Sequence, residues 1–203
     1  MSTTKFTDLF PYILPELNGC SSLQAEQHVR AAVIDFCCRS KVWSYSDEPT
    51  TTMGGAREYD LLPPSGTVLV EIKAMYCDGT LMQPDPDEYA EPLATGAPSL
   101  YRQPSPEVFV LWPMPNGEYD ITIDMTLAPS RASVGFPSWI AERYHDAIVY
   151  LSKSRLMLMP GNPWTNPQQA AIYRSQYETE VSVAMADKSK AFSRTALRTT
   201  SQH

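Results

Sequence analysis

Histidine, a common side chain in acid–base and metal sites, is scarce in this chain. Its three histidines are His28, His145 and His203, and none has a second His, a Cys or an Asp at the spacing of a metal site. His145 precedes Asp146 in a stretch with helical periodicity, which favours a partly exposed structural pair over a catalytic one. No G-x-S-x-G elbow for a serine nucleophile is present.

Two loops contain residues that could bind ions. Gly54-Gly55 lacks the downstream Lys-Ser/Thr pair and the strand-to-helix context of a phosphate loop, so we interpret it as a turn. An acidic run follows later, at Asp85, Asp87, Glu88 and Glu91. It lacks the central Gly and the terminal bidentate Glu of a calcium-binding loop. A solvated acidic loop is the better interpretation.

The Trp and Cys residues favour packing over chemistry. Trp112, Trp139 and Trp164 come from different expected elements, which favours core or subunit-contact roles over a carbohydrate-stacking platform. The four cysteines form no C-x-x-C pair, so we expect reduced thiols; they are Cys20, Cys37, Cys38 and Cys77. We therefore predict that the chain is not an enzyme and has no catalytic, metal or cofactor site.

The net charge of the chain argues against one class of partner, nucleic acids. The 203 residues carry a net charge of −7, which argues against a general nucleic-acid binder because such a protein needs a basic face. Four bases and no acid lie between Lys188 and His203, so residues 1–187 carry −7 − 4 = −11. The polar N-terminus has no signal-peptide core, and no apolar run reaches the roughly 18 residues of a membrane span. We expect a protein made in a cytoplasm, with no membrane partner.

Helical patterns lie at both ends of the chain. Ser21 and Gln24 have capping-box spacing, and an apolar stripe follows, which predicts a helix from Ser22 to about Lys41. A second helix is expected from Pro137 to Leu158. A third begins after Asn166, with Pro167 at the favoured first position, and runs to about Lys190. Its expected inner face is Ile172, Tyr173, Tyr177 and Val181.

Between the first two helices, the chain is rich in Pro and in short extended segments. Residues 68–76 and 108–112 are the clearest strand patterns. Asp78-Gly79 and Asn116-Gly117 are two-residue hairpin signals, the second leading into a strand at residues 119–127. Hairpins imply antiparallel pairing.

These elements predict an α+β protein. The expected fold is a helical bundle of three long helices, with an antiparallel β-rich domain inserted between the first and the second, and an extended C-terminal tail. The expected domains are residues 1–41 (N-terminal segment and first bundle helix), 42–130 (inserted β-rich domain), 131–190 (two bundle helices) and 191–203 (tail).

Five segments carry a resemblance to a known family. They are FPYILPE at residues 10–16, AEQHVRAA at 25–32, WIAERY at 139–144, LMPGNPW at 158–164 and FSRTALR at 192–198. With the element order, they resemble tailed-phage head-to-tail adaptors of the tail tubular protein A, or gatekeeper ring, family. The resemblance implies a structural virion protein at the head–tail interface. It also implies a twelve-fold ring between the portal and a tail or nozzle protein, with viral DNA passing through the lumen without specific binding.

The resemblance further implies that C-terminal segments dock into clefts of the portal. In this chain, the role falls on Phe192, Arg194, Thr195, Leu197 and Arg198. Two alternatives remain open: a tail-completion or tube-terminating neck protein, which typically forms a smaller ring, and a virion-associated hydrolase.

Overall fold

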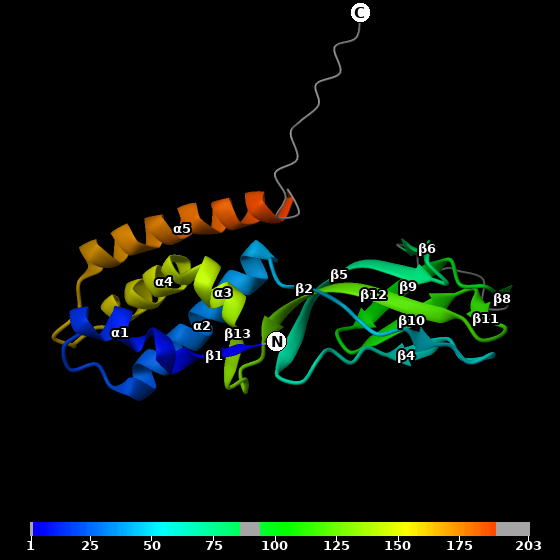
Figure 1. Cartoon of the computed structure of the whole chain (residues 1–203), viewed down its shortest axis with the longest axis horizontal. Helices are drawn as coiled ribbons and strands as arrows, with labels where there is room; N and C mark the ends of the chain where they lie inside the picture. Colours follow the sequence, from blue (N-terminus) through cyan, green and yellow to red (C-terminus); the bar gives the residue numbers. More distant parts are fainter. Residues whose placement is uncertain (1, 86–93, 190–203) are drawn as a thin grey trace, which may run out of the picture. The chain divides into compact units, whose positions relative to one another are not determined.

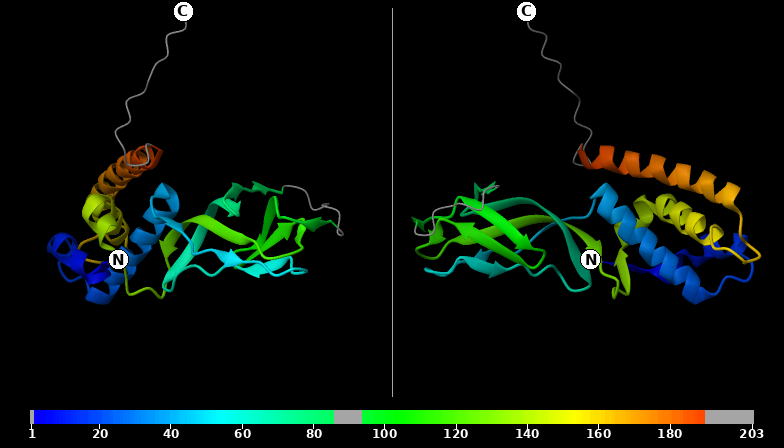
Figure 2. Two further views of the ribbon diagram at one scale, coloured as in Figure 1. Left: turned by 45° about the vertical axis from the view of Figure 1, so that its right-hand side comes forward. Right: turned by 180° about the vertical axis from the view of Figure 1, so that it is seen from behind.

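The chain folds into two compact units. A computed structural model describes residues 2–85 and 94–189. The helical unit comprises Met1–Val42 and Pro129–His203, and the β unit comprises Trp43–Ala128. Figure 1 and Figure 2 show the helices and the sheets of the two units.

Within the helical unit, α2, α4 and α5 pack side by side (Figure 1). The α-helices are α1 (Phe10–Ile13), α2 (Ser22–Ser40), α3 (Ser138–Arg143), α4 (His145–Met157) and α5 (Pro167–Ser189), with 3-10 turns at η1 (Phe6–Leu9) and η2 (Leu14–Glu16). A two-stranded antiparallel sheet of β1 (Thr3–Lys5) and β13 (Gly135–Pro137) joins the two segments of the unit. The fully buried side chains include Phe36 of α2 and Tyr177 of α5.

The predicted starts of two helices are confirmed. The Ser21 hydroxyl accepts a hydrogen bond from the Gln24 backbone at 3.2 Å, and the Gln24 side chain accepts one from the Ser21 backbone at 3.3 Å. At α5, the Asn166 side chain accepts a hydrogen bond from the Gln169 backbone at 3.1 Å. Each cap satisfies a backbone donor that the helix itself leaves without a partner.

The middle helix departs from the prediction. The structure ends α3 at Arg143 and begins α4 at His145, and Tyr144 between them has φ −122° and ψ 29°, outside the helical region. The Tyr144 ring is buried against Phe36, with ring centroids 5.0 Å apart. Because Tyr144 is in phase with the apolar stripe, the periodicity does not reveal this break.

The predicted fold class is therefore wrong in its architecture. The described residues form a β-rich α+β fold with five α-helices, rather than a bundle of three long helices with an inserted domain. Among the helices within residues 2–85 and 94–189, only α2 and α5 are long, while the N-terminal segment adds α1 and two 3-10 turns. The predicted extended tail, residues 191–203, lies outside the described residues.

The β unit contains most of the strands. They are β2 (Ser44–Ser46), β3 (Thr50–Thr51), β4 (Glu58–Asp60), β5 (Thr67–Cys77), β6 (Thr80–Leu81), β7 (Gln83–Pro84), β8 (Thr95–Gly96), β9 (Leu100–Ser105), β10 (Val108–Trp112), β11 (Met114–Pro115) and β12 (Asp120–Pro129). One sheet has the order β2-β12-β5-β6, with β3 also on β12, and another has the order β4-β10-β9-β7. Ile121, Ile123 and Met125 alternate as buried residues of β12, as a strand with one face in a core requires.

One of the two predicted hairpins is confirmed. Asp78 and Gly79 have φ of 47° and 76°, and Tyr76 pairs with Leu81 across the turn from β5 to β6. Two successive positive φ values match the turn twist that a two-residue hairpin needs.

The Asn116-Gly117 hairpin is wrong. Both edges of β10 are already occupied, by β4 and β9, so β12 joins the other sheet instead. The turn therefore passes the chain from one sheet to the next. The β unit is also not wholly antiparallel, because the short pairs β7–β9 and β8–β11 are parallel.

Candidate functional site

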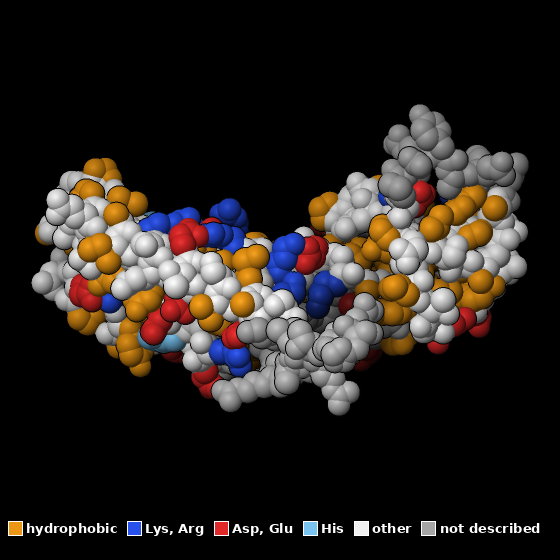
Figure 3. All heavy atoms as spheres, turned by 90° about the horizontal axis from the view of Figure 1, so that it is seen from above, with side chains coloured by type: hydrophobic (Ala, Val, Ile, Leu, Met, Phe, Trp, Pro, Cys, Tyr) orange, Lys and Arg blue, Asp and Glu red, His pale blue; other side chains and the backbone are white. Residues whose placement is uncertain are grey.

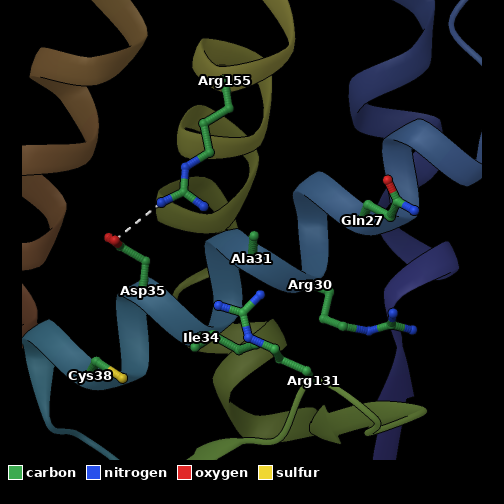
Figure 4. Close-up of a pocket in the computed structure, with 8 residues that line it drawn as sticks. All are labelled: Gln27, Arg30, Ala31, Ile34, Asp35, Cys38, Arg131 and Arg155. Atoms are coloured by element: carbon green, nitrogen blue, oxygen red, sulfur yellow. Dashed lines mark hydrogen bonds and ion pairs between the residues drawn. The ribbon is translucent and has the colours of Figure 1, made fainter.

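A hollow of about 630 Å³ opens on the helical unit between α2, α4 and the loop before β13 (Figure 4). We call it the arginine pocket, because Arg30, Arg131 and Arg155 line it, with Asp35 as the one acidic side chain. The rest of the lining is uncharged and comes from α2: Gln27, Ala31, Ile34 and Cys38.

Helix α2 builds one wall of the arginine pocket through its periodicity. Ala25, Val29 and Val33 are fully buried, whereas Gln27 and Cys38 are exposed. Residues three and four apart share a helix face, so Gln27, Ala31, Ile34 and Cys38 form a stripe beside the buried one. The same helix thus packs the core with one face and lines the hollow with another.

Asp35 holds Arg155 in place on the α4 side of the hollow. One carboxylate oxygen of Asp35 accepts a hydrogen bond from Arg155 Nη2 at 3.1 Å, drawn as a dashed line in Figure 4. The other accepts one from the Tyr177 hydroxyl of α5 at 2.6 Å. Burial raises the pKa of Tyr177, and the Asp35 carboxylate raises it further, so this hydroxyl keeps its proton and donates.

The other two arginines differ in their partners. Arg30 Nη2 donates to Glu26 at 2.7 Å and its guanidinium lies over the Phe6 ring at 5.0 Å, while its buried Nε has no hydrogen-bond partner in the part of the chain that the structure describes. Arg131 is exposed, and it makes no hydrogen bond or ion pair with another described residue. In Figure 4, its guanidinium points toward α2. Arg131 is therefore the cation of the pocket most available to an anion.

Two neighbouring groups that could do chemistry are held in unreactive forms. Burial lowers the pKa of His28, and the charge of Arg155 lowers it further, so this imidazole is neutral at neutral pH. Burial and the Asp35 charge raise the pKa of Cys38, which keeps the thiol protonated. The pocket therefore offers positive charge and hydrogen-bond donors, but no activated nucleophile.

The outward face of α5 is a second candidate surface. Its buried face is Ala170, Tyr177, Val181 and Ala184. The opposite face is exposed and has no charged residue over its length; it comprises Gln168, Ala171, Ile172, Ser175, Gln176, Thr179, Ser182, Val183 and Ala186. We call this the α5 stripe. Figure 3 looks onto this side of the helical unit. Ile172 was predicted to face inward, but it is 51% exposed, in the middle of the stripe.

Three other candidates from the sequence, His145, Trp112 and Trp139, have structural partners. His145 Nδ1 lies 3.0 Å from Asp146 Oδ1, and the Tyr12 ring contacts the imidazole edge-on at 4.4 Å. Trp112 lies under Arg57 at 4.8 Å, and Trp139 contacts the Tyr144 ring. No group of three or more metal-binding side chains occurs within residues 2–85 and 94–189. No helix in those ranges is long and apolar enough to cross a membrane.

The predicted portal-binding residues cannot be placed on either surface. Phe192, Arg194, Thr195, Leu197 and Arg198 lie outside the described residues, as do Asp87, Glu88 and Glu91 of the acidic run. Conversely, the arginine pocket had no signal in the sequence, because Arg131 and Arg155 lie more than 90 positions from Arg30 and Asp35. The α5 stripe could have been found in the sequence, because a set of positions at helical spacing within residues 168–186 contains no charged residue.

Comparison with known proteins assigns the family. The model of the SU10 adaptor protein family matches residues 4–200, nearly the whole chain. A search of curated proteins found no match. Members of such a family are structural components of the virion that connect head and tail proteins, which agrees with the resemblance in the sequence. The chain belongs to the SU10 adaptor protein family, and is a phage head-to-tail adaptor.

Proposed function

We propose that copies of this chain form a ring between the portal and the tail, and that viral DNA passes through the ring. Beyond the family match, the observation that carries this proposal is the α5 stripe. Interface cores are depleted of charged residues relative to the remaining surface, and this face has none over more than five helical turns.

The occupant that we propose for the α5 stripe is a second copy of the chain. A ring is built from heterologous contacts, in which one patch of each copy meets a different patch of the next. Ile172 and Val183 are each about half exposed, at 51% and 50%, and would lose that exposure in such a contact. The small residues between them let another element approach the helix closely.

Portal docking is assigned to the segment from Ala191 to His203. Phe192 and Leu197 supply apolar side chains, each worth roughly 1.5–3 kcal/mol when fully buried. Arg194 and Arg198 supply guanidinium groups, which make forked bonds to carboxylates. The resemblance to portal-docking adaptors supports this assignment, and it also supports the twelve-fold symmetry.

The charge of the chain suits a DNA conduit. The net charge of −7 disfavours adhesion of phosphates to the protein, so DNA can slide past rather than bind. We propose that the channel-facing surface of the ring is acidic and that the ring helps to retain packaged DNA as a closed collar, without specific contacts to bases.

The test mixes the purified chain with its portal and counts copies by native mass spectrometry and electron microscopy. Twelve copies on the portal are expected, and a monomer without it, since docking on the portal brings the copies together. Six copies on a tail tube instead would support the tail-completion alternative, and cleared zones on a zymogram would support the hydrolase. A stable twelve-mer without portal would contradict assembly on contact.

A pair of substitutions tests the α5 stripe. Val183→Lys puts a charge into the proposed contact and should prevent ring closure. Because Lys is a good helix-forming residue, the substitution should leave α5 intact. Val134→Lys is the matched control, because Val134 is 82% exposed in the same unit and outside α5. Normal rings from Val183→Lys would exclude the α5 stripe as the contact.

A further inference from the structure

The two units differ strongly in formal charge. The β unit, residues 43–128, contains 14 acidic and 3 basic residues, a charge of 3 − 14 = −11. The whole chain carries −7, so the helical unit carries −7 + 11 = +4. Each copy therefore offers many carboxylates on the β unit. The +4 of the helical unit comes from its C-terminal residues Lys188, Lys190, Arg194 and Arg198, because residues 1–42 and 129–187 together contain nine basic and nine acidic residues. An acidic β unit favours contact with a local cationic site on another copy.

The arginine pocket is the place on the helical unit best built to receive a carboxylate. Arg155 is oriented by its 3.1 Å bond to Asp35, whereas Arg131 has no ion pair with any described residue. Guanidinium groups bind carboxylates through two parallel N–H donors. Ala31 and Ile34 add apolar lining that suits the methylene groups of an acidic side chain.

We propose that the arginine pocket of one copy binds an acidic side chain of the β unit of a second copy. The inference rests on the proposed function, because it names a contact between neighbouring copies of the ring. It also supplies the pair of unlike patches that a heterologous contact needs: a cationic hollow on one copy and an acidic surface on the next.

Phosphate of the viral DNA is the other anion that guanidinium groups attract, but two observations favour a protein carboxylate. The −11 charge of the β unit repels a polyanion from the whole chain, whereas a single carboxylate meets mainly the local charge of the pocket. The site is also a local hollow on the helical unit rather than a continuous face. A DNA backbone needs a continuous basic face to release its counterions.

The first test measures ring occupancy on the portal over a series of adaptor concentrations. Arg131→Glu reverses the charge of an exposed side chain without removing a bond of the fold. It should raise the concentration for full occupancy by about tenfold or more, since like charges at a contact are strongly unfavourable. Gln27→Glu, on exposed α2 lining, should act in the same direction by occupying the pocket with a carboxylate of its own chain.

Two controls separate the pocket from other effects. Lys5→Glu makes the same change in net charge at an exposed position of the helical unit outside the pocket, and should leave occupancy unchanged. Binding of single copies to immobilised portal at low adaptor concentration should be the same for all variants, because docking uses a different segment.

The second test identifies the partner directly. Arg131→Lys keeps the positive charge and introduces an amine that carbodiimide joins to a contacting carboxylate. Rings assembled on the portal from an equal mixture of ¹⁵N-labelled and unlabelled copies should give mixed-isotope crosslinks between the introduced lysine and residues 43–128. Crosslinks only within one isotope, or only to the helical unit, would overturn the proposal.

The remaining outcomes are distinct. If the wild type forms rings and Arg131→Glu forms them equally well, the pocket proposal fails and the proposed function stands. If the wild type binds a labelled DNA duplex and Arg131→Glu abolishes that binding, the site is a phosphate site and the proposal fails. If the wild type forms no ring with the portal, the proposed function fails and the inference fails with it.

Discussion

At the scale of single residues, Asp35 links three helices of the helical unit. It belongs to α2 and accepts hydrogen bonds from Arg155 of α4 and from Tyr177 of α5. Tyr177 is fully buried, so its hydroxyl has no access to water as an alternative partner. The Asp35 carboxylate, with both oxygens hydrogen-bonded, therefore joins the three helices and also orients Arg155 at the rim of the arginine pocket.

Tyr177→Phe isolates that link. The ring remains and no cavity forms, but one oxygen of Asp35 loses its donor, which should reduce the free energy of unfolding by about 1–3 kcal/mol. Urea unfolding followed by helical circular dichroism measures the loss. Tyr12→Phe is the control, because Tyr12 is 56% exposed and its hydroxyl makes no hydrogen bond to another described residue. Equal midpoints for the two variants would contradict the link.

Glu16 gives the helical unit a pH dependence. Partial burial alone would raise its pKa, but hydrogen bonds from Lys153 and Tyr173, both 2.6 Å long, together hold the pKa below the ordinary 4.5. A lowered folded-state pKa means that stability from this group is present above pH 4.5 and is lost as the pH falls through the folded-state value.

The expected result is therefore a pH-dependent difference between wild type and Glu16→Gln. The wild type should be more stable in urea above pH 4.5, and the difference should vanish in more acidic solution. Glu142→Gln makes the same substitution at an exposed residue with no partner among the described side chains, and serves as the control. A constant gap for Glu16→Gln would show that the bonds from Lys153 and Tyr173 do not matter.

At the scale of elements, local signals predicted where helices begin but not where one breaks. The caps at Ser21 and Asn166 depend on residues within three positions of one another, so the sequence is enough to reveal them. At the break, by contrast, the Tyr144 ring packs against Phe36, 108 positions away, and no residue nearby in the sequence marks the position. The same contrast separates the Asp78-Gly79 hairpin from Asn116-Gly117, whose outcome depends on β4 and β9 already flanking β10.

Asn166→Ala tests how much the cap contributes to α5, the helix that carries the α5 stripe. Loss of the 3.1 Å bond to the Gln169 backbone should destabilise the helical unit by about 1 kcal/mol. The matched control is Gln168→Ala, an exposed position of the first turn that makes no hydrogen bond to another described residue. Hydrogen exchange of the first-turn amides should accelerate in Asn166→Ala alone, and equal rates in both variants would argue against a capping role.

At the scale of the whole molecule, the family could be inferred from short contiguous segments of the sequence. The arginine pocket could be found only in the folded structure. Motifs such as WIAERY at residues 139–144 are contiguous, so their resemblance to adaptors was visible in the sequence. Arg131 and Arg155 have no informative spacing, because the loop and α4 bring them to α2 only in three dimensions. The architecture was partly wrong for the same reason, since sheet membership and the break at Tyr144 are decided by distant partners.

The role of the C-terminal segment is also a property of the whole assembly. Residues 191–203 follow α5, in which Ala184 is the final buried residue, so we expect the core not to depend on them. They combine Phe192 and Leu197 with Arg194 and Arg198, a composition suited to a cleft with apolar pockets and carboxylates.

Deletion of residues 191–203 should leave the thermal melting temperature unchanged and abolish capture by immobilised portal. The double variant Arg194→Glu with Arg198→Glu should also lose capture while preserving the apolar side chains and the chain length, which separates charge pairing from simple truncation. Full capture of the deletion variant would show that the segment is a frayed end rather than an anchor. A lowered melting temperature would show instead that the segment belongs to the fold, because an anchor that acts only on the portal contributes nothing to the stability of the free chain.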